Sequence, residues 1–217
     1  MNEKQKAKII INTLNKIYPK APVPLKSKNT FTLLISVLLS AQCTDVNVNN
    51  VTQDIYTKYY KPEHFVKLGR KKIEKLIKKI GIFRVKAKSI YLMSKQLLEK
   101  HNGKVPKTFE ELEKLPGVGH KTASVVMSQG FGFPAFAVDT HIHRLAQRWG
   151  LTNGKSVIKT EEDLKRIFTK KIWSKLHLQI IFYGREYCKA RDRYGLACEI
   201  CTTCCPNRKK PVITKKP

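Results

Sequence analysis

Apolar residues recur at helical spacing along most of this chain, and this period constrains the fold more than any other feature. In IEKLIKKI (73–80), the four large apolar residues fall at positions i, i+3, i+4 and i+7, the pattern that buries one face of a helix. The run FTLLISVLLSA (31–41) is apolar on nearly every side, which predicts a core helix, and it is about half the length of a membrane span. Convincing alternation with a period of two is absent. We therefore predict an all-α fold of about eight to ten helices.

Capping residues and glycines indicate where some of these helices begin and end. Thr108 and Glu111 have the spacing of an N-terminal capping box, and Thr160 precedes acidic residues, so we expect each threonine to begin a helix. The sequence LPGVG (115–119) ends the first of these helices, and HKTASVV (120–126) begins another. This stretch predicts two helices joined by a tight turn.

The charge of the chain is its strongest indication of a partner. There are 43 Lys and Arg residues against 16 Asp and Glu, a formal net charge of +27. Such a charge repels itself in a folded protein unless an anionic partner is common, and nucleic acid binding gains free energy when phosphates are neutralised. An anionic membrane surface and a generally lysine-rich proteome are the alternatives. A basic stripe over residues 71–79, continued by Arg84, Lys86 and Lys88, predicts a surface that meets phosphate.

The two ends of the chain carry no visible targeting segment. The first residues form a short amphipathic pattern without the apolar core and cleavage site of a signal peptide, so we expect a soluble, intracellular protein. Residues 206–217 are basic and rich in proline, which is typical of a frayed tail.

Gly117 and Gly119 predict a helix–hairpin–helix over about 108–131. Glycine allows a backbone to approach a partner closely, and the helix after the turn presents unpaired amides and a positive dipole end. These two features make a seat for a phosphate. A plain connection between packed helices is the alternative.

Lys121 follows this turn, where a cation opposes the helix dipole, so stability gives no reason for it. A nucleophilic lysine must lose its proton, and nearby cations, the helix N-terminus and desolvation all lower the pKa from about 10.4. Asp139 precedes another helix, where it is expected to be an N-cap, and a cap with a second oxygen can also stabilise a developing cation. A lysine that contacts phosphate or solvent is the alternative for Lys121.

Five of the six cysteines lie between residues 188 and 205. In an intracellular chain this clustering favours a metal centre over disulfides. Cys43 lies far from the others in sequence, and we expect it to be a small buried hydrophobic residue.

Taken together, several segments resemble the endonuclease III family, the bifunctional DNA glycosylases and abasic-site lyases of base excision repair. The similarity runs in order over nearly the whole chain and weakens after Cys188. It is carried by LLSAQCTDVNVNNVT (38–52), IKKIGIFRVKAKSI (77–90), LPGVGHKTASVV (115–126), AVDTHIHRLAQRWGL (137–151) and HLQIIFYGREYC (177–188).

The resemblance implies a two-lobed, all-α helix–hairpin–helix glycosylase fold. Residues 23–133 would form a six-helix barrel that carries the hairpin. Residues 1–22 and 134–217 would form a helical domain with an iron–sulfur cluster loop (188–205) and the basic tail. In that family the DNA cleft lies between the lobes.

The resemblance also implies the chemistry. Lys121 would attack C1′ of the sugar bearing an oxidised pyrimidine, the base would leave, and β-elimination from the Schiff base would cut the strand. Asp139 would stabilise the cationic sugar or the departure of the base. Such enzymes act on a nucleotide turned out of the duplex. Gln42 would fill the vacated space, and Ile82 would wedge from the opposite side.

The implied partner is duplex DNA that contains damaged pyrimidines or abasic sites. We expect a monomer in the cytoplasm, associated with the nucleoid and not with a membrane. The alternatives are a monofunctional adenine or mismatch-thymine glycosylase and a non-catalytic hairpin DNA-binding module. Relatives of the adenine-specific type lack the lysine that this chain has at position 121.

The family holds a 4Fe–4S cluster with the spacing C-x6-C-x2-C-x5-C, and this chain departs from that spacing. Nine residues separate Cys188 from Cys198, two separate Cys198 from Cys201, and Cys204 or Cys205 follows after two or three. We favour Cys205 as the fourth ligand because its spacing is nearer the family's. A zinc site with four thiolates is the alternative.

The first cysteine loop is longer than the family's and is basic. It carries Lys189, Arg191 and Arg193, which we expect to reach a phosphate. The metal centre would then be structural and would order a loop that contacts DNA.

Overall fold

The computed structural model describes residues 1–191 and 193–216, and every regular element within that part of the chain is helical. The predicted all-α fold is therefore confirmed. The described residues contain eleven α-helices, slightly more than the eight to ten predicted, and α11 spans only six residues, too few for a period to reveal it. None of the described helices combines the length and apolarity that crossing a membrane requires.

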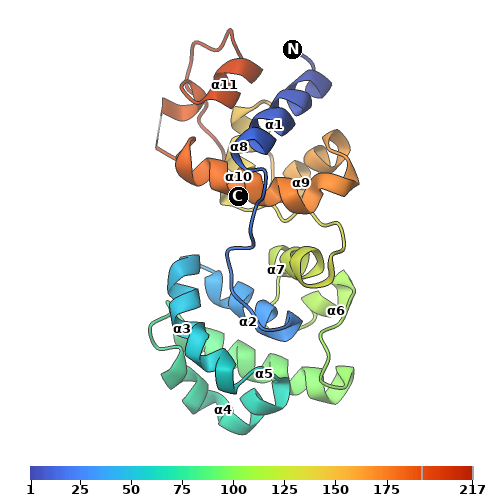
Figure 1. The fold of residues 1–217 in the computed structure, drawn as a ribbon, viewed down its shortest axis with the longest axis vertical. Coiled ribbons are helices and arrows are strands. Elements are labelled where there is room, and N and C mark those ends of the chain that lie inside the picture. Colours follow the sequence, from blue (N-terminus) through green and yellow to red (C-terminus); the bar gives the residue numbers. More distant parts are fainter. Residues whose placement is uncertain (192, 217) are drawn as a thin grey trace. The chain divides into compact units, whose positions relative to one another are not determined.

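The chain divides into two compact units, Val23–Phe133 and the combination of Met1–Pro22 with Pro134–Pro217. Figure 1 shows the elements of each along the chain. Val23–Phe133 holds α2 (Thr30–Ser40), α3 (Asp45–Lys58), α4 (Pro62–Leu76), α5 (Phe83–His101), α6 (Phe109–Glu113), α7 (His120–Val125) and the π-helical turn η1 (Val126–Gly130). The second unit holds α1 (Glu3–Ile17), α8 (Thr140–Arg148), α9 (Val157–Ile167), α10 (Trp173–Glu186), α11 (Glu199–Cys204) and the 3-10 turns η2 (Lys170–Ile172) and η3 (Arg193–Gly195).

Helix α2 is the core helix of Val23–Phe133. Every residue from Phe31 to Leu39 is buried, and the helix packs against α3, α5, α7 and η1. The predicted burial on nearly all sides is therefore confirmed. Asn29 begins the helix with a capping box, in which its side chain accepts from the Thr32 amide at 2.9 Å. Thr108 caps α6 as expected, since its Oγ1 accepts from the Glu111 amide at 3.3 Å.

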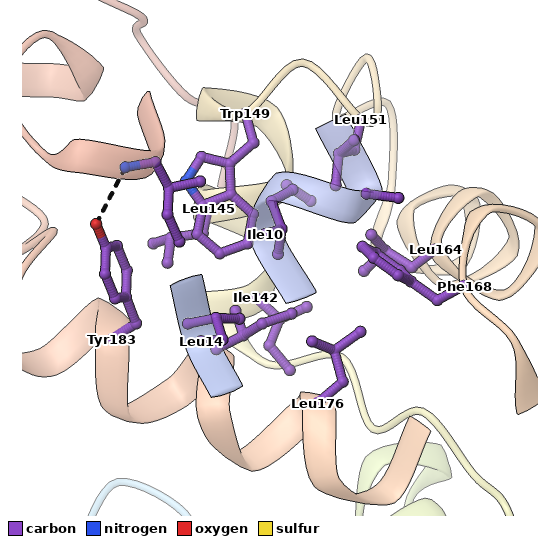
Figure 2. Packing of buried hydrophobic residues seen from close by; sticks show 14 of the residues in the cluster. Ile10, Leu14, Ile142, Leu145, Trp149, Leu151, Leu164, Phe168, Leu176 and Tyr183 are labelled. Atoms are coloured by element: carbon purple, nitrogen blue, oxygen red, sulfur yellow. Dashed lines mark hydrogen bonds between the residues drawn. The ribbon is translucent and has the colours of Figure 1, made fainter. Parts of the chain in front are cut away.

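The second unit is built from both ends of the chain, because α1 packs against α9, α10 and α11. In Figure 2, Ile10 and Leu14 of α1 lie among Leu145 and Trp149 from α8 and its C-cap, and Leu176 of α10. All five are at most 1% exposed. Helix α1 thus supplies central residues of a hydrophobic core. The residues that surround them lie more than a hundred positions later in the sequence.

The start of α9 differs from expectation. Ser156, not Thr160, is the N-cap of α9, and Thr160 is a buried residue whose Oγ1 lies 2.8 Å from His143 Nδ1. Threonine suits both an N-cap and a packed position near the start of a helix. The acidic residues that follow Thr160 are compatible with either position, so they did not identify the cap.

The C-terminal tail is docked and not frayed over its described residues. The Val212 amide donates to the Tyr194 carbonyl at 2.9 Å, and Lys215 exchanges two main-chain hydrogen bonds with the Gln147 side chain, at 2.8 and 3.1 Å. A side-chain amide can pair with an extended segment in this way because it carries both a donor and an acceptor.

Candidate functional site

The hairpin consists of α6, the turn before Gly119, and α7. Gly117 has φ +80, a conformation that costs other residues about 1–2 kcal/mol. A Cβ at this position would lie 2.8 Å from Ser89 Cβ and 3.1 Å from Leu38 Cδ1. The glycine is therefore required twice, by its dihedral angle and by the close approach of the turn to α5 and α2.

Gly119 is different, because it is the exposed N-cap of α7 with φ −99, and a Cβ there would meet nothing within 4 Å. Packing gives no reason for a glycine at this position. The first amides of a helix lack intrahelical partners, so this open edge presents donors to whatever approaches it. Lys121 lies exposed in the first turn of the same helix.

His120 fixes the orientation of the hairpin helices. Its Nδ1 lies 2.7 Å from Glu113 Oε1, and its ring stacks on Phe109 with centroids 5.5 Å apart. These contacts join the start of α7 to both ends of α6. Lys121 is therefore carried on a braced element.

Asp139 is the N-cap of α8, as predicted. The side chain is buried, and its Oδ1 accepts from the Ile142 amide at 2.9 Å. One carboxylate oxygen is thus engaged in starting the helix. Asp139 belongs to the unit that includes Pro134–Pro217, and Lys121 belongs to Val23–Phe133.

Gln42 and Ile82 share a conformation that the sequence did not reveal. Both are exposed and have positive φ, 55 for Gln42 in the turn after α2 and 50 for Ile82 at the N-cap of α5. Left-handed backbone is costly for residues other than glycine, and for a β-branched residue it is an outlier. Strain of this kind tends to gather at functional positions.

The predicted basic stripe is exposed at its lysines and arginine except at Lys86. Lys86 is only 4% exposed, and its Nζ donates to the carbonyls of Leu39 and Ala41 at 2.9 and 2.5 Å. The prediction that Lys86 belongs to the basic stripe that meets phosphate is wrong, because its side chain is buried at the C-terminal end of α2, where the dipole favours a cation.

Three of the clustered cysteines face one another. The Sγ atoms of Cys188, Cys198 and Cys201 all lie within 4.8 Å of one another, and those of Cys188 and Cys201 are 3.9 Å apart. Hydrogen bonds from the Cys198 and Cys201 thiols, together with one from Arg148, lower the pKa of Cys188. A buried group of thiols with a cationic donor fits a thiolate-bound metal, as an iron–sulfur cluster or zinc.

Arg148 is the residue of this site that the sequence prediction missed. Its Nη1 donates to Cys188 Sγ at 3.1 Å, and the guanidinium also donates to the carbonyls of Lys189 and Ala190 at 2.8 Å each. The spacing gave a signal, because Arg148 lies three residues after Leu145 on the apolar face of the same helix, and the structure buries it fully.

The other two cysteines lie outside the group of three. Cys204 is buried in the hydrophobic core, and burial together with the neighbouring Cys205 raises its pKa to about 11. Cys205 Sγ is half-buried and accepts from Arg208 Nη2 at 3.0 Å.

In the loop after Cys188, Lys189 and Arg191 are exposed. The side chain of Arg193 lies outside the described residues.

Comparison with known proteins gives a consistent result. Residues 35–170 match the family of HhH-GPD superfamily base excision DNA repair proteins. The chain is 41% identical over 201 residues to the endonuclease III of Bacillus subtilis (strain 168), covering 92% of each sequence. It is also similar to a trapped covalent intermediate of endonuclease III with DNA and to a non-covalent endonuclease III–DNA complex. For each of these structures the TM-score is 0.87 and the identity 42%, over 92% of this chain and 94% of the other.

The two hairpin glycines should differ in what they do for stability. Gly117→Ala should lower the free energy of unfolding by about 2–4 kcal/mol, because it adds both left-handed strain and overpacking. Gly119→Ala should lower it by less than about 1 kcal/mol, because its Cβ meets nothing and only the cap changes. Urea unfolding followed by far-UV circular dichroism measures both. Equal losses would contradict the distinction.

Proposed function

The chain belongs to the endonuclease III family of the HhH-GPD superfamily, and on that premise we propose that Lys121 and Asp139 excise damaged pyrimidines from duplex DNA and cleave the resulting abasic site. The enzyme is a base excision repair DNA glycosylase with abasic-site lyase activity. The observation that carries the assignment of residues is the position of Lys121, which is exposed one residue after the braced start of α7, beside the open edge at Gly119.

In this proposal Lys121 is the nucleophile. Its uncharged amine attacks C1′ of the damaged nucleotide, the bond from C1′ to the base breaks, and the base leaves with the bonding electrons and takes up a proton. The sugar ring then opens to a Schiff base with the lysine. Loss of a C2′ proton allows the 3′ phosphate to leave by β-elimination, and hydrolysis of the Schiff base restores the amine.

Asp139 has a different part in this reaction. Positive charge develops on the sugar as the base departs, and a carboxylate held rigidly by a helix start stabilises that charge without having to reorganise. The hydrogen bond from the Ile142 amide fixes one oxygen of Asp139. A fixed carboxylate suits this role better than a mobile one.

Binding of the DNA backbone is assigned to the hairpin and to the basic cysteine loop. The amides at Gly119 and the turn at Gly117 would hold a phosphate of the damaged strand. Lys189 and Arg191, both exposed, and Arg193 would reach further phosphates. Gln42 would occupy the space vacated by the damaged nucleotide, and Ile82 would wedge beside it. Action as a monomer on nucleoid DNA in the cytoplasm is part of the same proposal.

The cysteine site is assigned a 4Fe–4S cluster held by Cys188, Cys198, Cys201 and Cys205. Three of these thiols already form one buried group, and Arg208 donates to Cys205 as Arg148 does to Cys188. A guanidinium beside a sulfur favours the thiolate that a metal needs. When bound, the cluster would order the loop after Cys188 and would take no part in the reaction at the sugar.

Borohydride trapping tests the nucleophile. The wild-type protein should form a covalent adduct with duplex DNA containing an abasic site, because reduction fixes the Schiff base. Lys121→Gln should form none while binding the same duplex. A gel shift of the unreduced complex serves as the binding control. An adduct of normal yield in Lys121→Gln would refute the assignment and favour another nucleophile.

Asp139→Asn should separate capping from chemistry. Asparagine caps helices as well as aspartate does, so the free energy of unfolding should change by less than about 1 kcal/mol. The single-turnover excision rate should fall by about 100-fold or more, because a fixed charge is lost where positive charge develops. Trapping on a preformed abasic site should suffer far less, since no base has to leave. Excision at the wild-type rate would be the contrary result.

The fourth metal ligand can be found with two single substitutions. Cys205→Ser should purify with much less iron than the roughly four atoms per chain of a complete cluster, whereas Cys204→Ser should retain it. Iron, zinc and acid-labile sulfide are measured on each protein. The opposite pattern would assign Cys204, and stoichiometric zinc without sulfide would exclude the cluster.

A further inference from the structure

Lys86 reaches the main chain just before Gln42. Its Nζ donates to the carbonyls of Leu39 and Ala41, at 2.9 and 2.5 Å. Leu39 lies in the last turn of α2, and Ala41 is the residue immediately before Gln42. The ammonium therefore holds the peptide from which the left-handed turn at Gln42 departs.

The backbone of Lys86 contacts Ile82. Its amide donates to the Ile82 carbonyl at 3.2 Å, beside a bond of 3.1 Å from the Val85 amide to the same oxygen. Ile82 is the left-handed N-cap of α5, and no side chain caps it. One residue thus fixes the start of α5 through its backbone and the turn after α2 through its side chain.

Asn47 makes a second link between these two segments. Its Nδ2 donates to Cys43 Sγ at 3.1 Å and to the Lys79 carbonyl at 3.2 Å. The segments also meet directly, because a Cβ at Gly81 would lie 3.7 Å from the Gln42 carbonyl oxygen. Cys43 is half-buried and accepts this bond, so the expectation of a small buried hydrophobic residue is wrong.

These links explain how Gln42 and Ile82 keep strained backbone dihedral angles. Gln42 and Ile82 both have positive φ, and such conformations persist only where the surroundings over-determine them. A simple cap for α2 could be supplied by an exposed lysine at lower desolvation cost. Burying an ammonium costs desolvation free energy. That cost is offset when the ammonium fixes a backbone segment that an exposed, mobile side chain would leave free to move.

We propose that Lys86 is a positioning residue for base extrusion, which holds Gln42 and Ile82 as one rigid pair so that both enter the duplex together. This inference rests on the proposed function, because it presumes that the two exposed side chains enter DNA. Lys86 touches neither the sugar nor the base in this role. Its loss should therefore affect only substrates whose damaged nucleotide must first leave the helix.

The test compares two substrates and two variants. Lys86→Met keeps the length of the side chain and removes the ammonium, and Lys95→Met removes an exposed charge from the same helix as a matched control. One substrate is a duplex with a single oxidised thymine, assayed by single-turnover excision. The other is a single-stranded oligonucleotide with an abasic site, assayed by borohydride trapping, which requires no extrusion from a duplex.

Lys86→Met should lower the excision rate on the duplex by about 10- to 100-fold, the range expected when binding groups are misplaced by about an ångström. Trapping on the single strand should stay within about twofold of wild type, and Lys95→Met should match wild type on both substrates. In a Gln42→Ala/Ile82→Ala background, adding Lys86→Met should change the duplex rate by less than about twofold, because the residues through which it acts are gone.

Each other outcome has a definite meaning. Equal rates for Lys86→Met and Lys95→Met on the duplex would overturn the proposal, and so would equal losses on both substrates, which indicate general damage to the fold. If Lys86→Met does not fold, Asn47→Ala decides, with the same contrast between substrates expected at smaller size and its absence overturning the idea. A wild type inactive on both substrates would overturn the proposed function and this role with it.

Discussion

Cations bound to main-chain carbonyl oxygens hold the candidate functional segments of this protein in place. Lys86 binds the carbonyls of Leu39 and Ala41 at the end of α2, and Arg148 binds two carbonyls of the cysteine loop as well as a thiol. Arg144 binds the carbonyls of Gly184 and Cys188 at 3.0 and 2.9 Å. Acidic residues are outnumbered 43 to 16, so carbonyls at helix ends and in loops are the plentiful acceptors. A cation whose hydrogen-bond acceptors are main-chain carbonyls holds the backbone in place. A cation paired with a carboxylate would hold only a side chain.

The same principle explains why the strained positions can exist on a helical scaffold. A helix end leaves carbonyls without partners, and a loop that departs from it in a left-handed turn adds strain. At the end of α2 the ammonium of Lys86 meets both demands. At the hairpin a glycine removes the strain instead, and the contact of the His120 ring with the Glu113 carboxylate braces the helices. Two different solutions thus produce two rigid, exposed edges within Val23–Phe133.

The sequence predicted what depends on local pattern, such as the burial of α2, the hairpin and the cap at Asp139. It failed where a polar side chain joins residues distant in sequence. Lys86 was placed among exposed neighbours, yet it lies four residues before Ile90 and seven before Met93, on the buried face of α5. The helical period predicts that Lys86 lies on the buried face, but it does not identify the carbonyl groups that the ammonium contacts. The docked tail and the role of Arg148 were missed for the same reason.

The cysteine loop shows how the fold accommodates a departure from the family's spacing. Nine residues between Cys188 and Cys198 give a longer loop to order, and the guanidinium of Arg148 binds the first two carbonyls of that loop. Cys188 and Cys201 also belong to the hydrophobic core that α1 completes. A metal there would therefore tighten a site already fixed by packing. The basic residues thus fall into two groups. Exposed lysines can meet phosphate, and a few buried cations fix the backbone segments that carry the exposed surface.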